Sequence, residues 1–385
     1  MSKERVKVAG HSLDGVINAL RKQLDVPLFM PSSRRIVPMR HKSLGVLLGG
    51  EQSPGLPSGY WIEIVGNAAS GKTTLAFTLA EAVMSQPADA TFVSPSAEGM
   101  KTTPVPRKVL YLDFEHTLDM TYLKACAPSA VVAVADTNGK IANIDSANLF
   151  VHSPATLEEG VDIAVALCDT GEFGLVVVDS IPAMLSAAEQ DLSMASNTVG
   201  LLPRQLNKMF RRMTGSMARN GCTTILINQW RDKIGVAFGD PRTTPGGKAT
   251  EYFDAIKLDV SGSHKPGYFS AGKICNIRCM KNKVTGLRGN VATYELGHGV
   301  GISAEVELFD RAVEAGVIKN GRTCTIAAPG REAVNLGSAI KVIERLRSDK
   351  KFRDAMERTV ASNEAKGIKS QQQVKGRVML AGMDD

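Results

Sequence analysis

The chain has 385 residues, of which 43% are hydrophobic and 22% are charged, and these fractions exclude fibrous and largely disordered proteins. Lysine and arginine outnumber aspartate and glutamate by 46 to 39, and the formal charge of +7 is compatible with a polyanionic partner without establishing one. No apolar run approaches the roughly 18 residues of a membrane span, and the first residues lack the apolar segment of a signal peptide, so we expect a cytoplasmic protein.

Residues 1–35 predict one helix and a linker. Apolar residues recur at helical spacing over residues 12–24, and prolines and a basic pair then break the pattern. A helix of this kind packs either on its own domain or on a neighbouring subunit, and the sequence leaves both arrangements open.

Residues 36–300 have the alternating pattern of an α/β core. Near-continuous apolar runs are typical of parallel strands covered on both faces, and such runs occur at residues 61–65, 109–112, 175–178 and 224–227. A stretch rich in Pro, Ser and Ala at residues 85–107 interrupts the pattern, and we interpret it as a surface insertion between a helix and the next strand. The predicted fold class is therefore α/β with a mostly parallel sheet.

After Ile302 the strand pattern ends, and helical patterns follow at residues 304–317 and 336–360. They predict a small, mainly helical C-terminal domain over residues 301–362, without strands, and a flexible tail over residues 363–385. The exposed face of the second pattern is rich in lysine and arginine. Such a face is typical of a solvated helix and is also compatible with nucleic-acid binding.

The stretch GNAASGKT at residues 66–73 matches the motif G-x-x-x-x-G-K-[ST], and it lies between a predicted strand and a predicted helix over residues 74–84. The backbone N–H groups of such a loop converge on phosphates, its lysine pairs with the β and γ phosphates, and the next hydroxyl reaches Mg²⁺. We predict that ATP and Mg²⁺ are bound here by Gly66, Ser70, Gly71, Lys72, Thr73 and Thr74.

Two further strand ends supply carboxylates to the same edge of the sheet. Asp179 ends the run LVVVD, and we predict that it holds the metal with Thr73; the alternative is an ordinary aspartate that caps a turn. Glu115 follows the run VLYLD, and we predict that it orients the water that attacks the γ phosphate. Asp113 is an equivalent candidate for that role on sequence grounds.

A polar stretch of unusual length, NQWRDKIGVAFGDPRTTPGGK at residues 228–248, follows the strand at residues 224–227. Loops of this length inside a domain are usually functional. Gln229 is its first long polar side chain, so we expect its amide to face the phosphates and to sense the γ phosphate. We predict that the rest binds a polyanion through basic side chains and closely approaching glycines, namely Arg231, Lys233, Arg242, Gly246, Gly247 and Lys248.

The helix predicted from residue 201 has a basic stripe opposite an apolar one. Arg204, Lys208 and Arg211 follow one another at spacings of four and three residues. Such a stripe is more often a solvated face, but its position beside two polar stretches and a nucleotide site favours nucleic-acid binding.

These stretches resemble the RecA family of recombinases, including its phage relatives, over about residues 43–316. The polar stretch resembles the family's second DNA-binding loop, and LDFEHTLD at residues 112–119 resembles its catalytic glutamate segment. VVVDS at residues 176–180 resembles its metal-binding strand, and MKNKV at residues 280–284 its paired lysines. The resemblance implies a RecA-like P-loop ATPase core with an N-terminal helix and a small C-terminal domain.

The resemblance also implies how the nucleotide is enclosed. Asp119 and Tyr122 would flank the adenine. Lys281 and Lys283 would reach across a subunit interface to the γ phosphate of the neighbour, so that ATP is buried between protomers of a helical filament. The N-terminal helix would dock on the adjacent protomer, with Tyr252 near that interface.

For DNA, the resemblance implies that Val199 and Ile234 insert between base triplets of the bound strand. The phosphates of that strand would lie near Arg204, Arg211, Arg231, Gly246 and Gly247.

The chain departs from the family pattern at several places. Arg242 replaces an expected acid and Lys248 an expected asparagine, which predicts tighter and more salt-dependent DNA binding. The insertion at residues 85–107 is absent from the bacterial pattern, and the C-terminus carries two acids where bacterial members have a strongly acidic tail. A divergent or phage-encoded member fits these departures, and inhibition by an acidic tail is in doubt.

The function implied by the resemblance is ATP-dependent homologous pairing and strand exchange in DNA recombination and repair. A filament on single-stranded DNA would pair with homologous duplex DNA and hydrolyse ATP in a DNA-dependent way, with single-strand binding or loader proteins as further partners. Its location would be the cytoplasm of a bacterium or of an infected host cell. The alternatives are a hexameric helicase or translocase on the same core and an accessory paralogue without strand exchange; intact Lys72, Glu115 and Gln229 argue against the paralogue.

Overall fold

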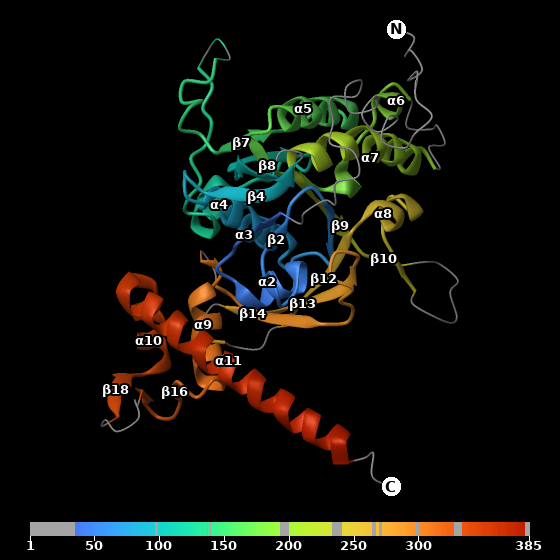
Figure 1. Cartoon of the computed structure of the whole chain (residues 1–385). Coiled ribbons are helices and arrows are strands. Elements are labelled where there is room, and N and C mark those ends of the chain that lie inside the picture. The colour runs from blue at the N-terminus through green and yellow to red at the C-terminus, as the bar shows by residue number, and fades with distance from the viewer. Residues whose placement is uncertain are drawn as a thin grey trace.

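The computed structural model describes residues 35–96, 99–136, 138, 140–192, 200–232, 241–263, 267–268, 272–297, 300–326 and 333–381. The predicted N-terminal helix lies outside these residues. Figure 1 shows a large α/β core and a smaller C-terminal part, from which the last helix extends away. Within the described part of the chain, no helix combines the length and the apolar character needed to cross a membrane.

The core is built on one nine-stranded sheet with the order β15-β14-β13-β12-β3-β9-β8-β6-β7. Neighbouring strands from β12 to β7 are parallel, and β13, β14 and β15 continue the sheet in antiparallel fashion, which confirms the predicted mostly parallel sheet. The strands are β3 Trp61–Gly66, β6 Lys108–Asp113, β7 Leu149–His152, β8 Phe173–Asp179, β9 Thr223–Gln229, β12 Ile256–Ser263, β13 Lys273–Asn282, β14 Val291–Gly297 and β15 Gly301–Ile302.

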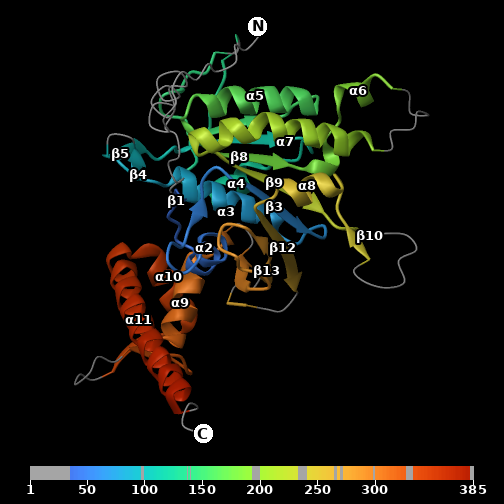
Figure 2. The same cartoon turned by 45° about the vertical axis from the view of Figure 1, so that its right-hand side comes forward.

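Helices cover both faces of the sheet, which explains why its central strands are apolar without alternation. Figure 2 shows α5 (Leu157–Asp169) and α7 (Leu201–Asn220) on one side, and α2 (Lys42–Gly49) and α3 (Lys72–Met84) on the other. Each side has its own buried apolar cluster. On the α7 side the rings of Trp61 and Phe210 meet edge to face at 4.6 Å between centroids.

Short elements connect this framework. They are β1 Ile36–Val37 paired with β2 Leu56–Pro57, the helices α4 Met120–Cys126, α6 Ala187–Gln190 and α8 Lys248–Phe253, the 3₁₀ turn Ile181–Ala183, and the ladder of β10 Arg231–Asp232 with β11 Arg242–Thr243. The predicted insertion at residues 85–107 does lie between α3 and β6, and it contains an antiparallel hairpin of β4 Thr91–Ser96 and β5 Gly99–Pro104.

The C-terminal part has its own buried apolar cluster, formed mainly by helices as predicted. Its helices are α9 Ala304–Glu314, α10 Ala339–Ser348 and α11 Lys350–Ala381. The prediction that strands end at Ile302 is wrong, because a three-stranded sheet follows, formed by β16 Ile318–Lys319, β17 Cys324–Ile326 and β18 Val334–Gly337. Strands of two to four residues are too short to show a period-two pattern in the sequence.

The helix α11 continues to Ala381, past residue 363, where the sequence predicts the start of a flexible tail. Glu364 fixes this part of the helix to the core side of the molecule. Its carboxylate accepts two hydrogen bonds of 2.9 Å from Arg311 on α9 and one of 2.8 Å from Lys42 on α2. A bidentate arginine contact of this kind holds a helix more firmly than helix propensity alone.

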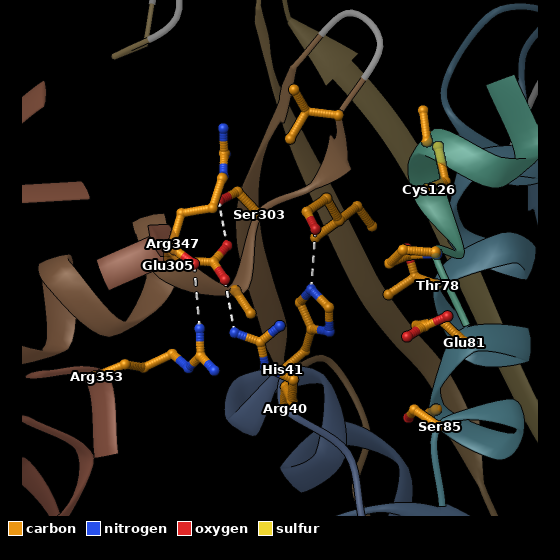
Figure 3. A pocket seen from close by; sticks show the side chains of 16 residues that line it. Arg40, His41, Thr78, Glu81, Ser85, Cys126, Ser303, Glu305, Arg347 and Arg353 are labelled. Carbon is orange, nitrogen blue, oxygen red and sulfur yellow. Dashed lines mark hydrogen bonds and ion pairs between the residues drawn. The ribbon is translucent and has the colours of Figure 1, made fainter. Parts of the chain in front are cut away.

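A cavity of about 360 Å³ separates the C-terminal part from the rear end of α3. Figure 3 shows Thr78 and Glu81 of α3 and the C-cap residue Ser85 on one wall, and Arg347 and Arg353 on the opposite side. Burial raises the pKa of Glu81, although Ser129 donates hydrogen bonds to its carboxylate.

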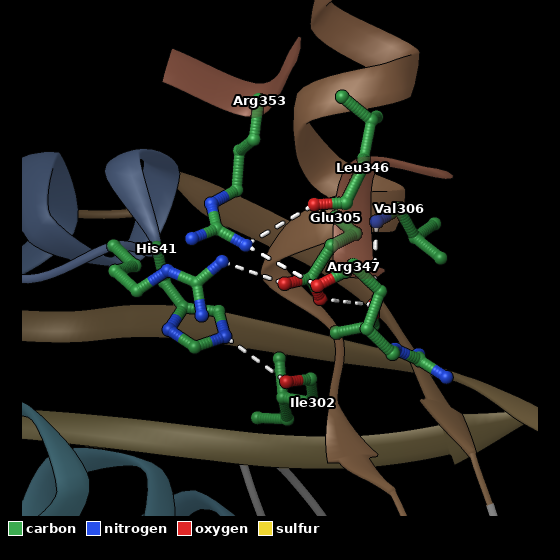
Figure 4. A network of polar contacts seen from close by, with 9 residues as sticks. His41, Ile302, Glu305, Val306, Leu346, Arg347 and Arg353 are labelled. Atoms are coloured by element: carbon green, nitrogen blue, oxygen red, sulfur yellow. Dashed lines mark hydrogen bonds and ion pairs between the residues drawn. The ribbon is translucent and has the colours of Figure 1, made fainter. Parts of the chain in front are cut away.

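Polar contacts close the same junction (Figure 4). Arg40 donates a hydrogen bond of 2.6 Å to Glu305, and Arg353 donates one of 3.2 Å to the carbonyl of Leu346. The ring Nε2 of His41 lies 3.0 Å from the carbonyl oxygen of Ile302. Since a carbonyl only accepts, this nitrogen carries the proton, and burial lowers the pKa of His41.

Candidate nucleotide site and adjoining basic surface

The predicted phosphate loop connects the end of β3 to the start of α3. Residues 67–69 are exposed, while Ser70 and Lys72 are buried. Gly66 has no room for a side chain, since a Cβ there would lie 2.3 Å from the carbonyl oxygen of Val260. Gly71 has a φ of +105°, a conformation that favours glycine, immediately before the first turn of α3. The loop therefore presents its backbone at a helix N-terminus, which suits an anion.

A cavity of about 680 Å³ opens beside this loop. It brings together the predicted residues Ser70, Gly71, Lys72, Thr73, Thr74, Asp119 and Tyr122, and also Lys273, which the sequence did not indicate. Gly66 lies below the loop as the last residue of β3. The volume is in the range of small-molecule sites.

Asp119 and Tyr122 are held against the loop by local hydrogen bonds. Asp119 is the N-cap of α4, and its carboxylate accepts hydrogen bonds from the backbone N–H groups of Thr121 and Tyr122, at 2.8 and 3.1 Å. The hydroxyl oxygens of Tyr122 and Thr74 are 2.7 Å apart, and burial raises the pKa of Tyr122. Hydrogen bonds thus hold the aromatic ring of Tyr122 in the lining of the cavity.

Lys72 is 7% exposed, and its ammonium donates a hydrogen bond of 2.7 Å to the carbonyl of Asn67 within the loop. Burial lowers its pKa, and the nearby carboxylates of Asp179 and Glu115 oppose that effect. The lysine is therefore positioned inside the loop, where a phosphate would meet it.

Asp179 ends β8 directly beside the first turn of α3. Its carboxylate accepts hydrogen bonds from Thr73 Oγ1 at 3.1 Å and from the Tyr111 hydroxyl at 2.6 Å. Burial raises its pKa, while these two hydrogen bonds lower it. A hydroxyl and a single carboxylate fit Mg²⁺, which keeps waters and phosphates as its other ligands. Among the described residues, no group of three or more His, Cys, Asp and Glu forms a closed metal cage.

The two candidates for the water-orienting carboxylate differ in their surroundings. Asp113 is 5% exposed, and its carboxylate accepts hydrogen bonds from the backbone N–H groups of Leu118 at 3.1 Å and Thr117 at 3.4 Å. Glu115 is exposed and accepts a hydrogen bond from the hydroxyl of Ser180. Asp113 is thus engaged in holding its own loop, whereas Glu115 is exposed to solvent.

Gln229 lies beside the start of the phosphate loop in the sheet, and the contact of its amide with the γ phosphate stays a prediction. It is the last residue of β9, paired with Gly66 of β3, and it is half-buried. The next residues enter the β10–β11 ladder. One strand end therefore joins the phosphate loop to the polar stretch.

Lys281 and Lys283 lie at the other end of the sheet from the phosphate loop. In the register of β12 and β13, Lys281 pairs with Lys257, whereas Val260, the partner of Gly66, pairs with Ile277. Both lysines donate hydrogen bonds to the last carbonyls of α8: Lys281 to that of Glu251, and Lys283, at 2.9 Å, to that of Tyr252. Burial and the neighbouring Lys283 lower the pKa of Lys281. These lysines do not belong to the phosphate site of their own chain.

The basic stripe of α7 is exposed as predicted. Arg204, Lys208 and Arg211 lie on its solvent side, while Leu206, Met209, Phe210 and Met213 are buried.

In the polar stretch, Arg231, Gly247 and Lys248 are exposed. Gly246 is buried, and a Cβ there would lie 2.6 Å from Leu206. Val199, Lys233 and Ile234 lie outside the described residues.

Arg242 contacts neighbouring side chains of its own chain, and its role in DNA binding stays a prediction. It is half-buried, and its guanidinium packs on the indole of Trp230 and pairs with Asp259. Neither partner was indicated by the sequence analysis, although a tryptophan in an otherwise polar stretch was a usable signal. Lys273 gave no signal; its ammonium donates to the carbonyl of Ala69 in the phosphate loop.

Comparison with known proteins shows the family of the chain. Residues 36–303 match the model of the RecA N-terminal domain. Protein RecA of Rubrobacter xylanophilus is 32% identical over 326 residues, covering 84% of this chain and 83% of that protein. Protein RecA of Acidothermus cellulolyticus is 34% identical over 286 residues, covering 74% and 72%. A crystal structure of the RadB recombinase aligns with a TM-score of 0.44 and 20% identity, covering 68% of this chain and 96% of the other. The chain belongs to the RecA family of recombinases.

Proposed function

We propose that this protein pairs homologous DNA and exchanges strands, as an ATP-dependent filament on single-stranded DNA. The observation that supports this most directly is the path of β9. Its last residue, Gln229, pairs with Gly66 of the phosphate loop, and the chain then runs directly into the basic polar stretch. A change at the nucleotide can therefore act on the predicted DNA-binding segment.

ATP would bind through the backbone of residues 66–74, with Lys72 on its phosphates and Tyr122 and Asp119 beside its base. Mg²⁺ would be held by Thr73 and Asp179 and would neutralise charge on the phosphates. Glu115 would orient the attacking water, since it is exposed and its carboxylate accepts a hydrogen bond from Ser180, the residue after Asp179.

Single-stranded DNA would lie along the exposed basic stripe of α7 and the polar stretch. Arg204, Lys208, Arg211, Arg231 and Lys248 supply positive charge to the phosphates, and Gly247 allows close approach. Val199 and Ile234 would separate base triplets. Homology would be tested by base pairing with duplex DNA, because the protein mainly offers backbone contacts.

The ATP-binding site would be completed by residues of a neighbouring protomer. Lys281 and Lys283 are at the far end of the sheet from their own phosphate loop, as expected for residues that act on the γ phosphate of the next subunit. The N-terminal helix would dock on that neighbour. Such a head-to-tail contact generates a helical filament when it does not close into a ring.

ATP turnover with and without single-stranded DNA tests this function. We expect DNA to stimulate hydrolysis and Lys72→Ala to remove it. A tailed duplex without a homologous strand should not be unwound. Directional unwinding of that duplex, with closed rings, would instead identify a translocase, and DNA-independent turnover would contradict the proposal.

A further inference from the structure

Trp230 is held at the end of β9 by polar and charged groups from other segments. Its Nε1 donates a hydrogen bond of 2.9 Å to Oδ1 of Asp259 on β12. The guanidinium carbon of Arg242 lies 4.5 Å from the centroid of the indole, and the ammonium of Lys257 lies 5.5 Å from it. Both distances are within the range of cation–π interaction. The half-buried ring thus binds side chains from two other segments.

Arg242 completes this arrangement from the second strand of the β10–β11 ladder. Its Nη1 lies 3.5 Å from Oδ2 of Asp259, so one carboxylate accepts the indole N–H and pairs with the guanidinium. Arg242 also pairs with Asp232 in the register of the ladder. We call Trp230, Arg242 and Asp259 the Trp230 clasp. The clasp connects β12 to the residue before β10 and to the first residue of β11.

The Trp230 clasp faces the phosphate loop. Asp259 pairs with Val65, the residue before Gly66, in the register of β12 and β3. A cavity of about 360 Å³ is lined by the three residues of the clasp, by residues 67–70 of the loop and by Lys273. The clasp and the phosphate loop therefore line one small space.

A buried polar network next to the clasp joins Asn228, Glu63 and Lys257. Nδ2 of Asn228 donates hydrogen bonds of 2.7 Å to Oε1 of Glu63 and of 3.0 Å to the carbonyl of Pro245. The ammonium of Lys257 lies 2.6 Å from Oε2 of Glu63. Hydrogen-bonded networks at low dielectric are rigid. Both ends of the polar stretch are thus tied to β3, the strand that leads into the phosphate loop.

We propose that the Trp230 clasp transmits nucleotide binding to the DNA-binding stretch, with Trp230 and Arg242 as positioning residues. This rests on the proposed function. Phosphates bound by residues 67–70 change the lining of the cavity that the loop shares with Trp230, and the ladder that begins at the next residue would move with the indole. A ligand shifts a conformational equilibrium only through contacts that differ between two states, and the clasp supplies such contacts on both sides.

The test is the coupling factor between two ligands, measured by equilibrium binding. The dissociation constant of a slowly hydrolysed ATP analogue with Mg²⁺ is determined with and without a thymidine oligonucleotide, and their ratio is the coupling factor. Coupling is reciprocal, so oligonucleotide binding with and without the analogue must give the same factor. Allosteric factors of about 5 to 150 are typical.

We expect Trp230→Leu and Arg242→Gln to lower the coupling factor at least fivefold toward one, while the affinity for the analogue without DNA stays within about twofold. Trp230→Phe, which keeps a ring and loses the N–H, should retain an intermediate factor. The matched control is Arg212→Gln, which removes one exposed arginine, paired with Asp162, from α7 and should keep the full factor.

An unchanged coupling factor in Trp230→Leu and Arg242→Gln would overturn the proposal. So would an Arg242→Gln variant that binds the oligonucleotide more weakly by the same factor with and without the analogue, because that is the behaviour of a direct phosphate contact. If Trp230→Leu does not fold, Trp230→Phe and Arg242→Gln decide. A wild-type protein that binds neither ligand would contradict the proposed function itself.

Discussion

The hydroxyl of Thr73, in the first turn of α3, donates a hydrogen bond of 3.1 Å to the carboxylate of Asp179 at the end of β8. The two residues are far apart in the sequence and meet because the carboxyl ends of parallel strands lie along one edge of the sheet. The hydroxyl of Tyr111, on the neighbouring strand β6, donates a hydrogen bond to the same carboxylate. This pair is the proposed magnesium site.

Replacing Thr73 tests that site. Thr73→Val keeps the shape of the side chain and loses the hydroxyl, and we expect the Mg²⁺ concentration for half-maximal ATP hydrolysis to rise about tenfold or more, as for the loss of a contact to a charged group. Thr73→Ser keeps the hydroxyl and should remain near the wild-type value. A magnesium titration of initial rates measures both, and equal values for the two variants would exclude Thr73 as a ligand.

Substitutions of Glu115 and Asp113 should differ in their effects on ATP hydrolysis and on stability. Glu115→Gln should lower kcat by about 10²- to 10⁴-fold, the usual contribution of a general base, with binding of a slowly hydrolysed ATP analogue retained. Asp113→Asn should act mainly on stability, because the Asp113 carboxylate accepts backbone hydrogen bonds within its own loop. Single-turnover rates and thermal unfolding distinguish the two. The opposite pattern would assign the base to Asp113.

Mixing two inactive variants tests whether Lys281 and Lys283 act across an interface. Neither Lys72→Ala alone nor the double variant Lys281→Ala/Lys283→Ala should hydrolyse ATP on DNA. In an equimolar mixture, about a quarter of head-to-tail interfaces combine an intact phosphate loop with intact lysines, so activity should reappear. If the mixture is as inactive as its components, Lys281 and Lys283 act within their own protomer and not across an interface.

We expect the free energy of unfolding to fall in mild acid because of His41. Burial lowers its folded-state pKa below the ordinary value of 6.5, although nearby Glu307 and the carbonyl of Ile302 oppose the effect. As the pH falls below about 6.5, unfolded chains take up a proton that the folded state does not, so the free energy of unfolding falls by at most about 1.4 kcal/mol per pH unit. Urea unfolding at pH 7 and pH 5.5 should show this loss. A His41→Gln variant should have a smaller difference between the two pH values.

Much of this architecture was predictable because local signals agreed with each other. The phosphate motif lay between an apolar run and a helical pattern, and the structure has β3 and α3 at those positions. The exposed stripe of α7 was predictable from spacing alone, because residues three and four apart share a helix face.

What the sequence did not reveal depends on contacts between distant segments. The sequence predicts that Arg242 binds a polyanion but does not reveal its contacts with Trp230 and with Asp259, which lies on a strand later in the chain. The ion pair of Lys257 with Glu63 is buried for the same reason, since β12 and β3 are neighbours only in the folded sheet. The strands β16 to β18 were missed because they are too short to carry a pattern.

Strand exchange by this protein is tested most directly by joint-molecule formation. A labelled single strand is incubated with supercoiled duplex DNA, homologous or heterologous, in the presence of the protein, Mg²⁺ and ATP. We predict joint molecules with the homologous duplex only, and none with Lys72→Ala. DNA-stimulated ATP hydrolysis without joint molecules, or products that form equally with heterologous duplex, would contradict strand exchange as the function of this protein.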